Sequence, residues 1–407
     1  MVRFAKALLV FAPMLSLFGW WDDDVHLPRP SSVQETLESI EIDLDFGGWW
    51  PFSDSWPFFN PRPPGGPSPA PPDPPATAPD DPSPPVAEEP TEPTTPGVPP
   101  LSDWPEWLAS GGDPADLVGF NGFYGDQRTG VHRWISQNPR DPLAVLLTRE
   151  IASQPVAYWV ADGAGAELSV FVETAAAENM VPVVVAYNIP HRDCGQHSSG
   201  GAADAEAYRD WVDEELVPAF GDHAAMLILE PDSLIHLSCL SGGLQDERLS
   251  LLSYAVEMLA ERAPNTAVYL DGGDGVHNSP AEMAPRLAAA GIENARGFAV
   301  NVSNYNTDEQ TDAFAAEMRR LLTEDHDVDA GYVVDTSRNG AGPGGDWCNP
   351  PDRRLGEPPR LATEGEAADA QLWIKHPGTS DGDCGIGRGT VSGEFYPDIA
   401  RELLSLN

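Results

Sequence analysis

Carboxylic acids follow several short apolar segments of this 407-residue chain. Two of these places read YNIPHRDC, which holds Asp193, and ILEPDSL, which holds Glu230 and Asp232. A buried parallel strand is exposed at its end, so a repeated apolar run followed by an acid collects carboxylates around one opening of a sheet. Carboxylates gathered in this way are typical of glycosidic bond cleavage.

Asp232 is the candidate proton donor for such a reaction. Cleaving an acetal requires a protonated carboxyl group at the leaving oxygen and a way to activate water from the opposite face. Asp232 lies just past a strand end that already carries Glu230. Crowding by a like charge and partial burial raise a carboxyl pKa towards the range that an acid needs. Taken alone, an acid at a strand end is more often a helix N-cap or a loop acceptor, so the rest of the chain decides.

The elements that must position these acids alternate along the chain. Seven apolar runs have the length and composition of strands covered on both faces. They are residues 156–160, 181–187, 225–229, 266–270, 297–302, 331–334 and 370–375. Helical spacing occupies residues 167–179, 203–220, 248–262, 281–290 and 308–323. This order predicts a βα series, either closed as a barrel or open as a doubly wound sheet, with the site at the carboxyl ends of the strands.

Composition divides the chain into a small number of regions. Eighteen of the 40 residues in 61–100 are proline, which predicts an extended linker that cannot bury a core. Residues 101–407 then form one domain with an ample core. Residues 22–60 carry aromatic side chains among acids, and we interpret them as a mostly unfolded segment, with an aromatic sugar-contacting patch as the alternative.

The amino terminus resembles a secretory signal. Arg3 and Lys6 precede an apolar stretch at residues 7–20, and no small-x-small cleavage site is obvious before Trp20. We therefore expect residues 1–21 to be a signal peptide and the protein to be secreted. An uncleaved membrane anchor is the alternative, because the segment can be interpreted as a short span.

Four cysteines fall inside the predicted final domain, and an even number in an exported chain favours disulfides. Of the three possible connectivities we prefer the sequential one, Cys194 with Cys239 and Cys348 with Cys384. Each bond would hold a loop that follows a strand end. No two cysteines have the close spacing of zinc ligands, so we expect no metal site.

The chain is strongly acidic, with 64 acids against 23 bases and a net charge of −41. Such a surface repels nucleic acid and anionic membrane, so neither is an expected partner. Self-repulsion of this size destabilises a compact state unless salt screens it, which predicts a salt-rich habitat. The alternative is that the charge serves solubility only.

Seven segments together resemble the catalytic domain of glycoside hydrolase family 6. In chain order they read YNIPHRDC, ILEPDSL, YLDGGD, GFAVNVSNYN, VVDTSRNG, GPGGDWCNP and LWIKHPGTSDG. The resemblance covers nearly all of residues 101–407. It implies an inverting cellulase on a distorted, seven-stranded parallel β/α barrel, acting on β-1,4-glucan without a cofactor. The family's disulfides agree with the sequential pairing.

The resemblance also implies roles for five catalytic residues. Asp232 matches the proton donor, and Asp193 matches the acid that supports its protonation. Tyr187 matches the tyrosine beneath the distorted sugar, and Ser199 the serine that holds the catalytic water. Asp381 matches the debated base, which activates water directly or through a chain of waters. The simpler alternatives are that Tyr187 ends a strand in the core and that Asp193 only pairs with Arg192.

The resemblance also implies that five further positions bind substrate. An indole plate suits the C–H face of a sugar, and polar groups suit its hydroxyls. These five positions are Trp159, Trp347, Trp373, Lys375 and Asn304. For Trp159 and Trp373 the alternative is packing in the barrel, and for Lys375 it is a solvated lysine.

Three positions depart from the family pattern. Thr379 stands where a glutamate usually precedes Asp381 by two residues, so one substrate-binding carboxylate is missing. Asp274 and His277 stand where a histidine and then a tryptophan usually follow the YLD strand. The loss of that stacking platform on the leaving-group side should weaken binding by about 1 kcal/mol or more.

Loop length predicts the mode of attack. Exo-acting members roof the site with long loops, whereas only Gly382 and Asp383 separate Asp381 from Cys384 here. We therefore predict an open cleft and an endoglucanase. The alternatives are an exo-acting cellobiohydrolase of the same family, a catalytically weakened β-glucan-binding protein, and an exported scaffold or adhesin. Because it is an exported hydrolase tethered to a linker, we also expect it to act as a monomer.

Overall fold

The computed structural model describes residues 120–362 and 366–406. The predicted segments 1–21, 22–60 and 61–100, together with the first residues of the predicted catalytic domain, lie outside these ranges. Within the described ranges, no helix combines the length and the apolar character needed to cross a membrane.

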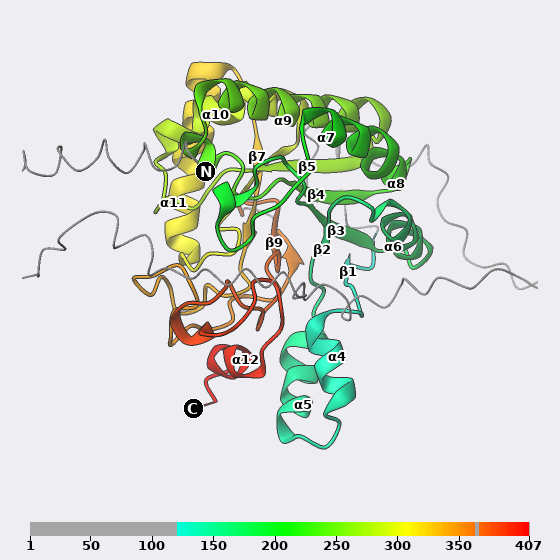
Figure 1. Ribbon diagram of the computed structural model, residues 1–407, viewed down its shortest axis with the longest axis vertical. Helices are drawn as coiled ribbons and strands as arrows, with labels where there is room; N and C mark the ends of the chain where they lie inside the picture. The colour runs from blue at the N-terminus through cyan, green and yellow to red at the C-terminus, as the bar shows by residue number, and fades with distance from the viewer. Residues whose placement is uncertain (1–119, 363–365, 407) are drawn as a thin grey trace, which may run out of the picture. The chain divides into compact units, whose positions relative to one another are not determined.

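The centre of the fold is a sheet of parallel strands, and each of the seven predicted apolar runs overlaps one of them (Figure 1). In spatial order these are β2 (Tyr158–Val160), β3 (Val181–Ala186), β4 (Ala225–Leu229), β5 (Thr266–Asp271), β6 (Gly297–Val300), β7 (Gly331–Asp335) and β9 (Ala370–Leu372). Two short strands were not predicted. β1 (Phe123–Tyr124) pairs in parallel with β3, and β8 (Arg360–Leu361) pairs antiparallel with β9.

The two ends of this sheet meet without forming a regular ladder. The N–H of Ala157, just before β2, donates to the Trp373 carbonyl just after β9, at 3.1 Å. The Trp159 indole donates to the Ile374 carbonyl at 2.8 Å, and the His376 ring contacts the Ala157 carbonyl at 2.6 Å. The sheet is therefore a nearly closed barrel, which confirms the predicted distorted β/α barrel over the open sheet.

Helices α6 (Gly165–Ala177), α7 (Ala205–Trp211), α8 (Val217–Phe220), α9 (Gly242–Arg262), α10 (Pro280–Ala289) and α11 (Asp308–His326) cover the outside of the barrel. The short helices α4 (Gly130–Gln137), α5 (Pro142–Leu147) and α12 (Pro397–Leu403) pack in a separate cluster beside it (Figure 1). The five helical segments predicted from spacing correspond to α6, to α7 with α8, and to α9, α10 and α11. In α9 the predicted stripe of Leu252, Val256 and Leu259 is fully buried. The short helices α4, α5 and α12 were not predicted.

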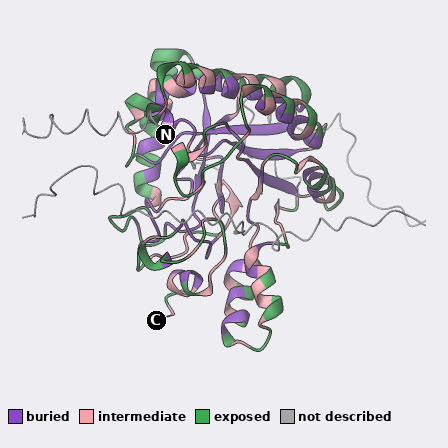
Figure 2. Cartoon of the chain, in the orientation of Figure 1, coloured by how far each residue is buried: buried purple, intermediate pink, exposed green. Residues whose placement is uncertain are grey.

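Strands β3 to β7 of the barrel are buried along their length (Figure 2), and successive strand residues alternate between two cores. In β3, Val184 and Ala186 pack against the helices, whereas Val183 and Val185 fill the barrel interior. Both faces are apolar, which explains why these strands are continuous apolar runs. Polar side chains are consequently placed beyond the strand ends. The carboxyl ends of β3, β4, β5 and β9 carry the residues of the candidate site.

Candidate active site

Asp232 and Tyr187 meet at the carboxyl ends of neighbouring strands. Tyr187 directly follows β3, Asp232 lies three residues after β4, and the Tyr187 hydroxyl donates to Asp232 Oδ2 at 3.4 Å. Burial raises the pKa of the part-buried Asp232 carboxyl; the charge of Asp193 raises it further, whereas His236 and Lys375 act in the opposite direction. Asp193 and Lys375 are therefore close enough to act on Asp232 electrostatically.

The backbone around Asp232 is held in an uncommon conformation. Glu230 and Asp232 have φ angles of 52° and 67°, in the left-handed region that non-glycine residues rarely occupy. The Asp232 N–H donates to Asp271 Oδ2 at 2.6 Å, which fixes this turn to the end of β5. Surroundings that hold a strained backbone in place are a frequent feature of functional sites.

Glu230 has a different position from the one predicted. Its buried carboxylate accepts hydrogen bonds from the backbone N–H groups of Asn188 and Ile189, at 2.9–3.0 Å, and so anchors the loop after β3. Burial raises the pKa of Glu230 to about 7, against the effect of those backbone hydrogen bonds. The sequence argument expected both partial burial and the charge of Glu230 to raise the Asp232 pKa; burial does raise it, but the like charge that acts on Asp232 is that of Asp193.

Asp193 lies in the loop after β3. The disulfide between Cys194 and Cys239 joins this loop to the loop after β4. The Asp193 carboxylate accepts from the Ser198 N–H at 2.7 Å and lies 3.6 Å from His236 Nε2. The Arg192 guanidinium is placed over the Tyr187 ring, 4.2 Å from its centroid, and bonds to the Tyr187 carbonyl. Asp193 therefore faces Ser198 and His236, and the alternative role as the ion-pair partner of Arg192 does not describe it.

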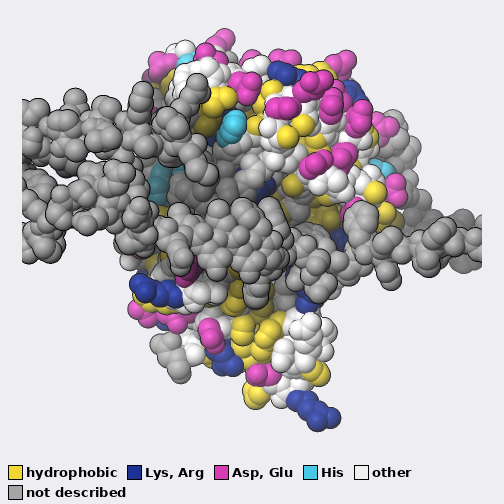
Figure 3. Space-filling view, viewed as in Figure 1, with side chains coloured by type: hydrophobic (Ala, Val, Ile, Leu, Met, Phe, Trp, Pro, Cys, Tyr) yellow, Lys and Arg dark blue, Asp and Glu magenta, His cyan; other side chains and the backbone are white. Residues whose placement is uncertain are grey.

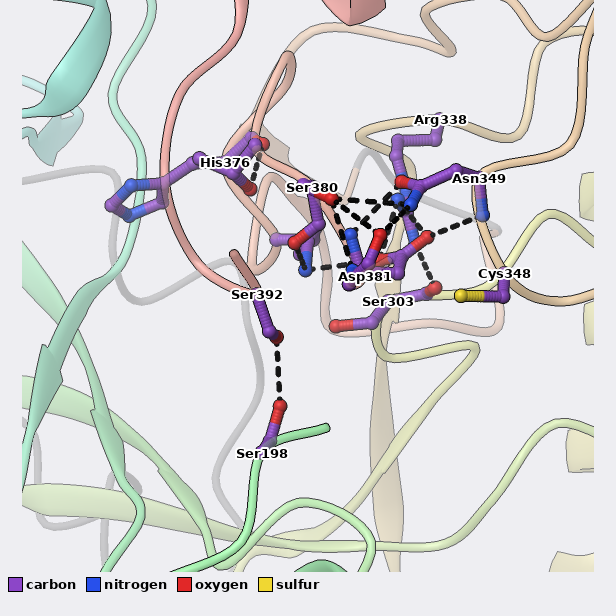
Figure 4. A network of polar contacts seen from close by, with 12 residues as sticks. Ser198, Ser303, Arg338, Cys348, Asn349, His376, Ser380, Asp381 and Ser392 are labelled. Atoms are coloured by element: carbon purple, nitrogen blue, oxygen red, sulfur yellow. Dashed lines mark hydrogen bonds and ion pairs between the residues drawn. The ribbon is translucent and has the colours of Figure 1, made fainter. Parts of the chain in front are cut away.

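Asp381 is the centre of a buried polar network (Figure 4). Arg338 Nη1 donates to both of its oxygens at 2.9 Å, Lys375 Nζ lies 3.0 Å from Oδ1, and the Tyr305 hydroxyl and the Asn349 N–H donate to Oδ2 at 3.1 and 3.0 Å. Burial alone would raise the pKa of Asp381, but the charges of Arg338 and Lys375 hold it well below its usual range. Asp381 is therefore held in its ionised form.

Comparison with known proteins identifies the family. Residues 120–404 match the family described as Glycosyl hydrolases family 6. The chain belongs to this family. It is 40% identical over 300 residues to Endoglucanase 1 of Streptomyces halstedii, covering 73% of this chain and 92% of that one. Over 239 residues it is 33% identical to a probable 1,4-beta-D-glucan cellobiohydrolase C of Aspergillus niger, covering 49% of this chain and 51% of that one.

A solved family 6 structure gives the same fold. The endoglucanase of Mycobacterium tuberculosis in complex with methyl-cellobiosyl-4-deoxy-4-thio-β-D-cellobioside superposes with a TM-score of 0.65 at 37% sequence identity. The match covers 72% of this chain and 98% of that chain. This glycoside hydrolase therefore has the distorted barrel of its family, with Tyr187, Asp193, Asp232 and Asp381 after strands β3, β4 and β9.

The remaining site residues predicted for this family 6 chain take different positions. Trp159 is half-buried, edge-on to the Tyr187 ring at 5.3 Å. Trp347 is 43% exposed, and Asn304 donates to the Val302 carbonyl at 3.1 Å. Ser199 is exposed in the loop that carries Asp193.

Trp373 lies in the core. It is 2% exposed, packs in a cluster with Val131 and Leu143, and donates its indole N–H to the Glu357 carbonyl at 2.9 Å. No ring face is open to a sugar, so the packing alternative describes Trp373 and the predicted stacking role does not.

Both predicted disulfides are confirmed. Cys194 is bonded to Cys239, and Cys348 to Cys384, with Cα–Cα distances of 6.5 and 5.9 Å. His197 lies near the second bond, but both of its sulfurs are oxidised and offer no thiolate to a metal.

Sequence reasoning missed the residues that hold Asp381. Arg338 is a buried cation in the segment after β7, and Tyr305 supplies a buried hydroxyl group from the segment after β6. The Arg338 guanidinium also lies 4.3 Å from the centroid of the Tyr305 ring. A signal was present, because Arg338 is a lone basic residue next to a buried strand. Its spacing alone does not indicate that it pairs with Asp381, which lies 43 residues further along the chain.

Proposed function

We propose that this chain is an inverting endo-β-1,4-glucanase in which Asp232 protonates the leaving oxygen. The observation that carries the proposal is the position of Asp232: a part-buried carboxyl with a raised pKa, beside Tyr187 and within electrostatic reach of Asp193 and Lys375. A carboxyl group whose pKa is raised holds its proton more readily, as acid-assisted cleavage of an acetal needs. The names of the Streptomyces and Mycobacterium relatives support the same activity.

The other polar residues have roles that follow from their contacts. In this proposal Asp193 stabilises the protonated form of Asp232 by its negative charge, and Tyr187 lies under the sugar whose bond is broken. Lys375 binds substrate, held by Asp381 and by Asp335, which accepts the Lys375 N–H at 3.0 Å. Ser199 holds the attacking water, and Trp159 and Trp347 supply ring faces to the sugar.

The first test is sugar release from carboxymethyl cellulose and barley β-glucan by the wild type and by Asp232→Ala. We expect release by the wild type and a loss of it in the variant. Proton NMR of the first product should show the α anomer. A β anomer would refute inversion, and a wild type that releases nothing would refute the enzyme in favour of a β-glucan-binding protein.

Exo action is the second candidate, and one contact favours it. Ser198, in the loop after β3, shares a hydrogen bond with Ser392, in the loop after β9, at 2.9 Å (Figure 4). The His197 ring lies against Gly382, where an added Cβ would come within 2.6 Å of it. The short 381–384 segment favours an open cleft. These contacts instead connect the loop after β3 with the loop after β9, as a covered site of an exo-acting enzyme would require.

Viscosity measurements distinguish the two modes. An endoglucanase lowers the viscosity of a soluble cellulose faster than it produces reducing ends, because it cuts within chains. Proportional changes in both quantities would contradict the endo proposal. In that case Ser198→Ala and Ser392→Ala, which remove the loop contact, should shift the enzyme towards endo action.

We also propose that the enzyme is secreted, works as a monomer and suits salt-rich surroundings. Two disulfides support an oxidising compartment. Acidic side chains are spread over the helix-covered part in the upper half of Figure 3, in keeping with the net charge of −41. Fractionation of a culture of the source cells, with activity retained in the cell pellet, would contradict secretion.

A further inference from the structure

Asp274 and His277 form a polar pair in the turn after β5 that the proposed reaction does not use. Asp274 Oδ2 lies 2.7 Å from His277 Nδ1, and Oδ1 accepts from the N–H groups of Val276 and His277 at 2.9 and 3.0 Å. The Asp274 side chain is 1% exposed and that of His277 is 40% exposed. A buried carboxylate therefore holds an imidazole whose other nitrogen, Nε2, has no hydrogen-bond partner among the described residues.

This turn is rigidly built. Asn306, in the loop after β6, donates to the Asp274 carbonyl at 2.5 Å. Gly275 has a φ of +79° and packs so tightly that an added Cβ would come within 2.9 Å of the Phe314 ring. The orientation of the His277 ring is thus set by Asp274 and by the packed turn, as is required of a preorganised binding group.

The same turn is connected to the proposed proton donor. Asp271 accepts the Asp232 N–H through Oδ2 and the Gly273 N–H through Oδ1, at 2.6 and 3.0 Å. The hydrogen bond to Asp274 raises the pKa of His277, against partial burial, and the charges of Asp274 and Asp232 raise it further. His277 is therefore near enough to Asp232 for the two groups to interact electrostatically.

The order of the strands places His277 on a defined side of Asp232. Tyr187 follows β3, Asp232 follows β4 and His277 follows β5, and these three strands are consecutive in the sheet. Asp232 thus lies between the other two. If Tyr187 is beneath the sugar that is attacked, then the sugar that leaves lies on the His277 side.

We propose that His277 recognises the leaving-group sugar of a β-glucan through a hydrogen bond between its Nε2 and a hydroxyl group, with Asp274 as the positioning residue. This inference rests on the proposed function. A single directional hydrogen bond replaces contact with a flat aromatic face, so recognition on this side depends on a sugar hydroxyl. A leaving group without hydroxyl groups gains nothing from it.

Two substrates separate this role from a structural one. Cellopentaose presents a sugar on the leaving-group side, whereas 2,4-dinitrophenyl β-cellobioside presents an aryl group there. We expect His277→Ala to lower kcat/KM for cellopentaose about tenfold, as for loss of one hydrogen bond, with no change for the aryl substrate. His277→Gln, whose amide can also form a hydrogen bond to a hydroxyl group, should restore part of the loss, and Asp274→Asn should show a selective loss of the same kind.

Val276→Ser is the matched control, because Val276 is the exposed neighbour in the same turn and should leave both substrates unaffected. Equal losses on both substrates in His277→Ala would indicate a structural role and overturn the inference, as would no loss on either. A wild type that is inactive on both substrates would overturn the proposed function itself, and this inference with it.

Discussion

Replacement of Arg338 by methionine should destabilise the fold markedly, because Arg338 neutralises a buried carboxylate. The two side chains are only 2% and 5% exposed, and both oxygens of Asp381 accept from Arg338 at 2.9 Å. Removing one partner of a buried ion pair costs about 3–5 kcal/mol, since the other charge is left uncompensated. Lys375 remains 3.0 Å from the carboxylate, so we expect the lower end, about 3 kcal/mol.

Thermal unfolding followed by circular dichroism measures this effect. A loss of about 3 kcal/mol corresponds to a fall in Tm of about 6–12 °C for a domain of this size. The double variant Arg338→Met with Asp381→Asn should be more stable than the sum of the single changes predicts, by about 1–3 kcal/mol. Strictly additive effects would refute the claim that these two groups stabilise the fold as a pair.

The pH dependence gives a second readout of the same pair. The folded-state pKa of Asp381 is far below its unfolded value, so its contribution is complete above the unfolded pKa of about 3.9 and is lost as the pH falls towards the folded pKa. Arg338→Met raises the folded pKa. The difference in stability between wild type and variant should therefore narrow below about pH 4.

Four further predictions follow from the same contacts. Asp232→Ala should lower kcat about 10²–10⁴-fold on cellopentaose but far less on 2,4-dinitrophenyl β-cellobioside, whose leaving group needs no proton; equal losses would argue against an acid role. Burial raises the pKa of both Glu230 and Asp271 to about 7, so the stability that their protonated forms contribute is lost as the pH rises from about 4 to 7. The contribution of Asp381 is lost in the opposite direction, below about pH 4, so Tm should peak near pH 4; a Tm that rises steadily to pH 8 would contradict this. Reduction of the disulfides, which close loops with sequence separations of 45 and 36, should cost about 4 kcal/mol each in denaturant titrations with and without reductant. Tm should rise between low salt and molar NaCl, because salt screens a net charge of −41, and a flat response would remove the salt-adaptation proposal.

The barrel and its disulfides were predictable because their signals are local. A strand such as β4 is buried on both faces, so its five residues are all apolar and its end is marked by Glu230. By contrast, the two-residue strand β1 and the antiparallel β8 have no periodic pattern, since partner strands far along the chain define them. Helices α5 and α12 are too short for a spacing argument to detect.

The sequence predicted which residues belong to the site better than it predicted the contacts that they make. The family motifs supplied Asp232 and Asp381, but spacing does not say which way a side chain turns. Glu230 turns towards the backbone of Asn188, and Trp373 turns out of the barrel into a cluster with α4 and α5. Both outcomes depend on packing between segments that are distant in sequence.

The environments of Asp232 and Asp381 assign them opposite tasks. Burial without a direct cationic partner raises the pKa of Asp232, whereas Arg338 and Lys375 depress that of Asp381. Two carboxyl groups whose pKa values are driven apart divide acid and non-acid roles between them. A carboxylate with a strongly depressed pKa and oxygens that already accept from four donor groups is a poor proton acceptor. We therefore propose that Asp381 fixes Lys375 and supplies negative charge, and that the proton of the attacking water leaves through a chain of waters rather than directly to Asp381.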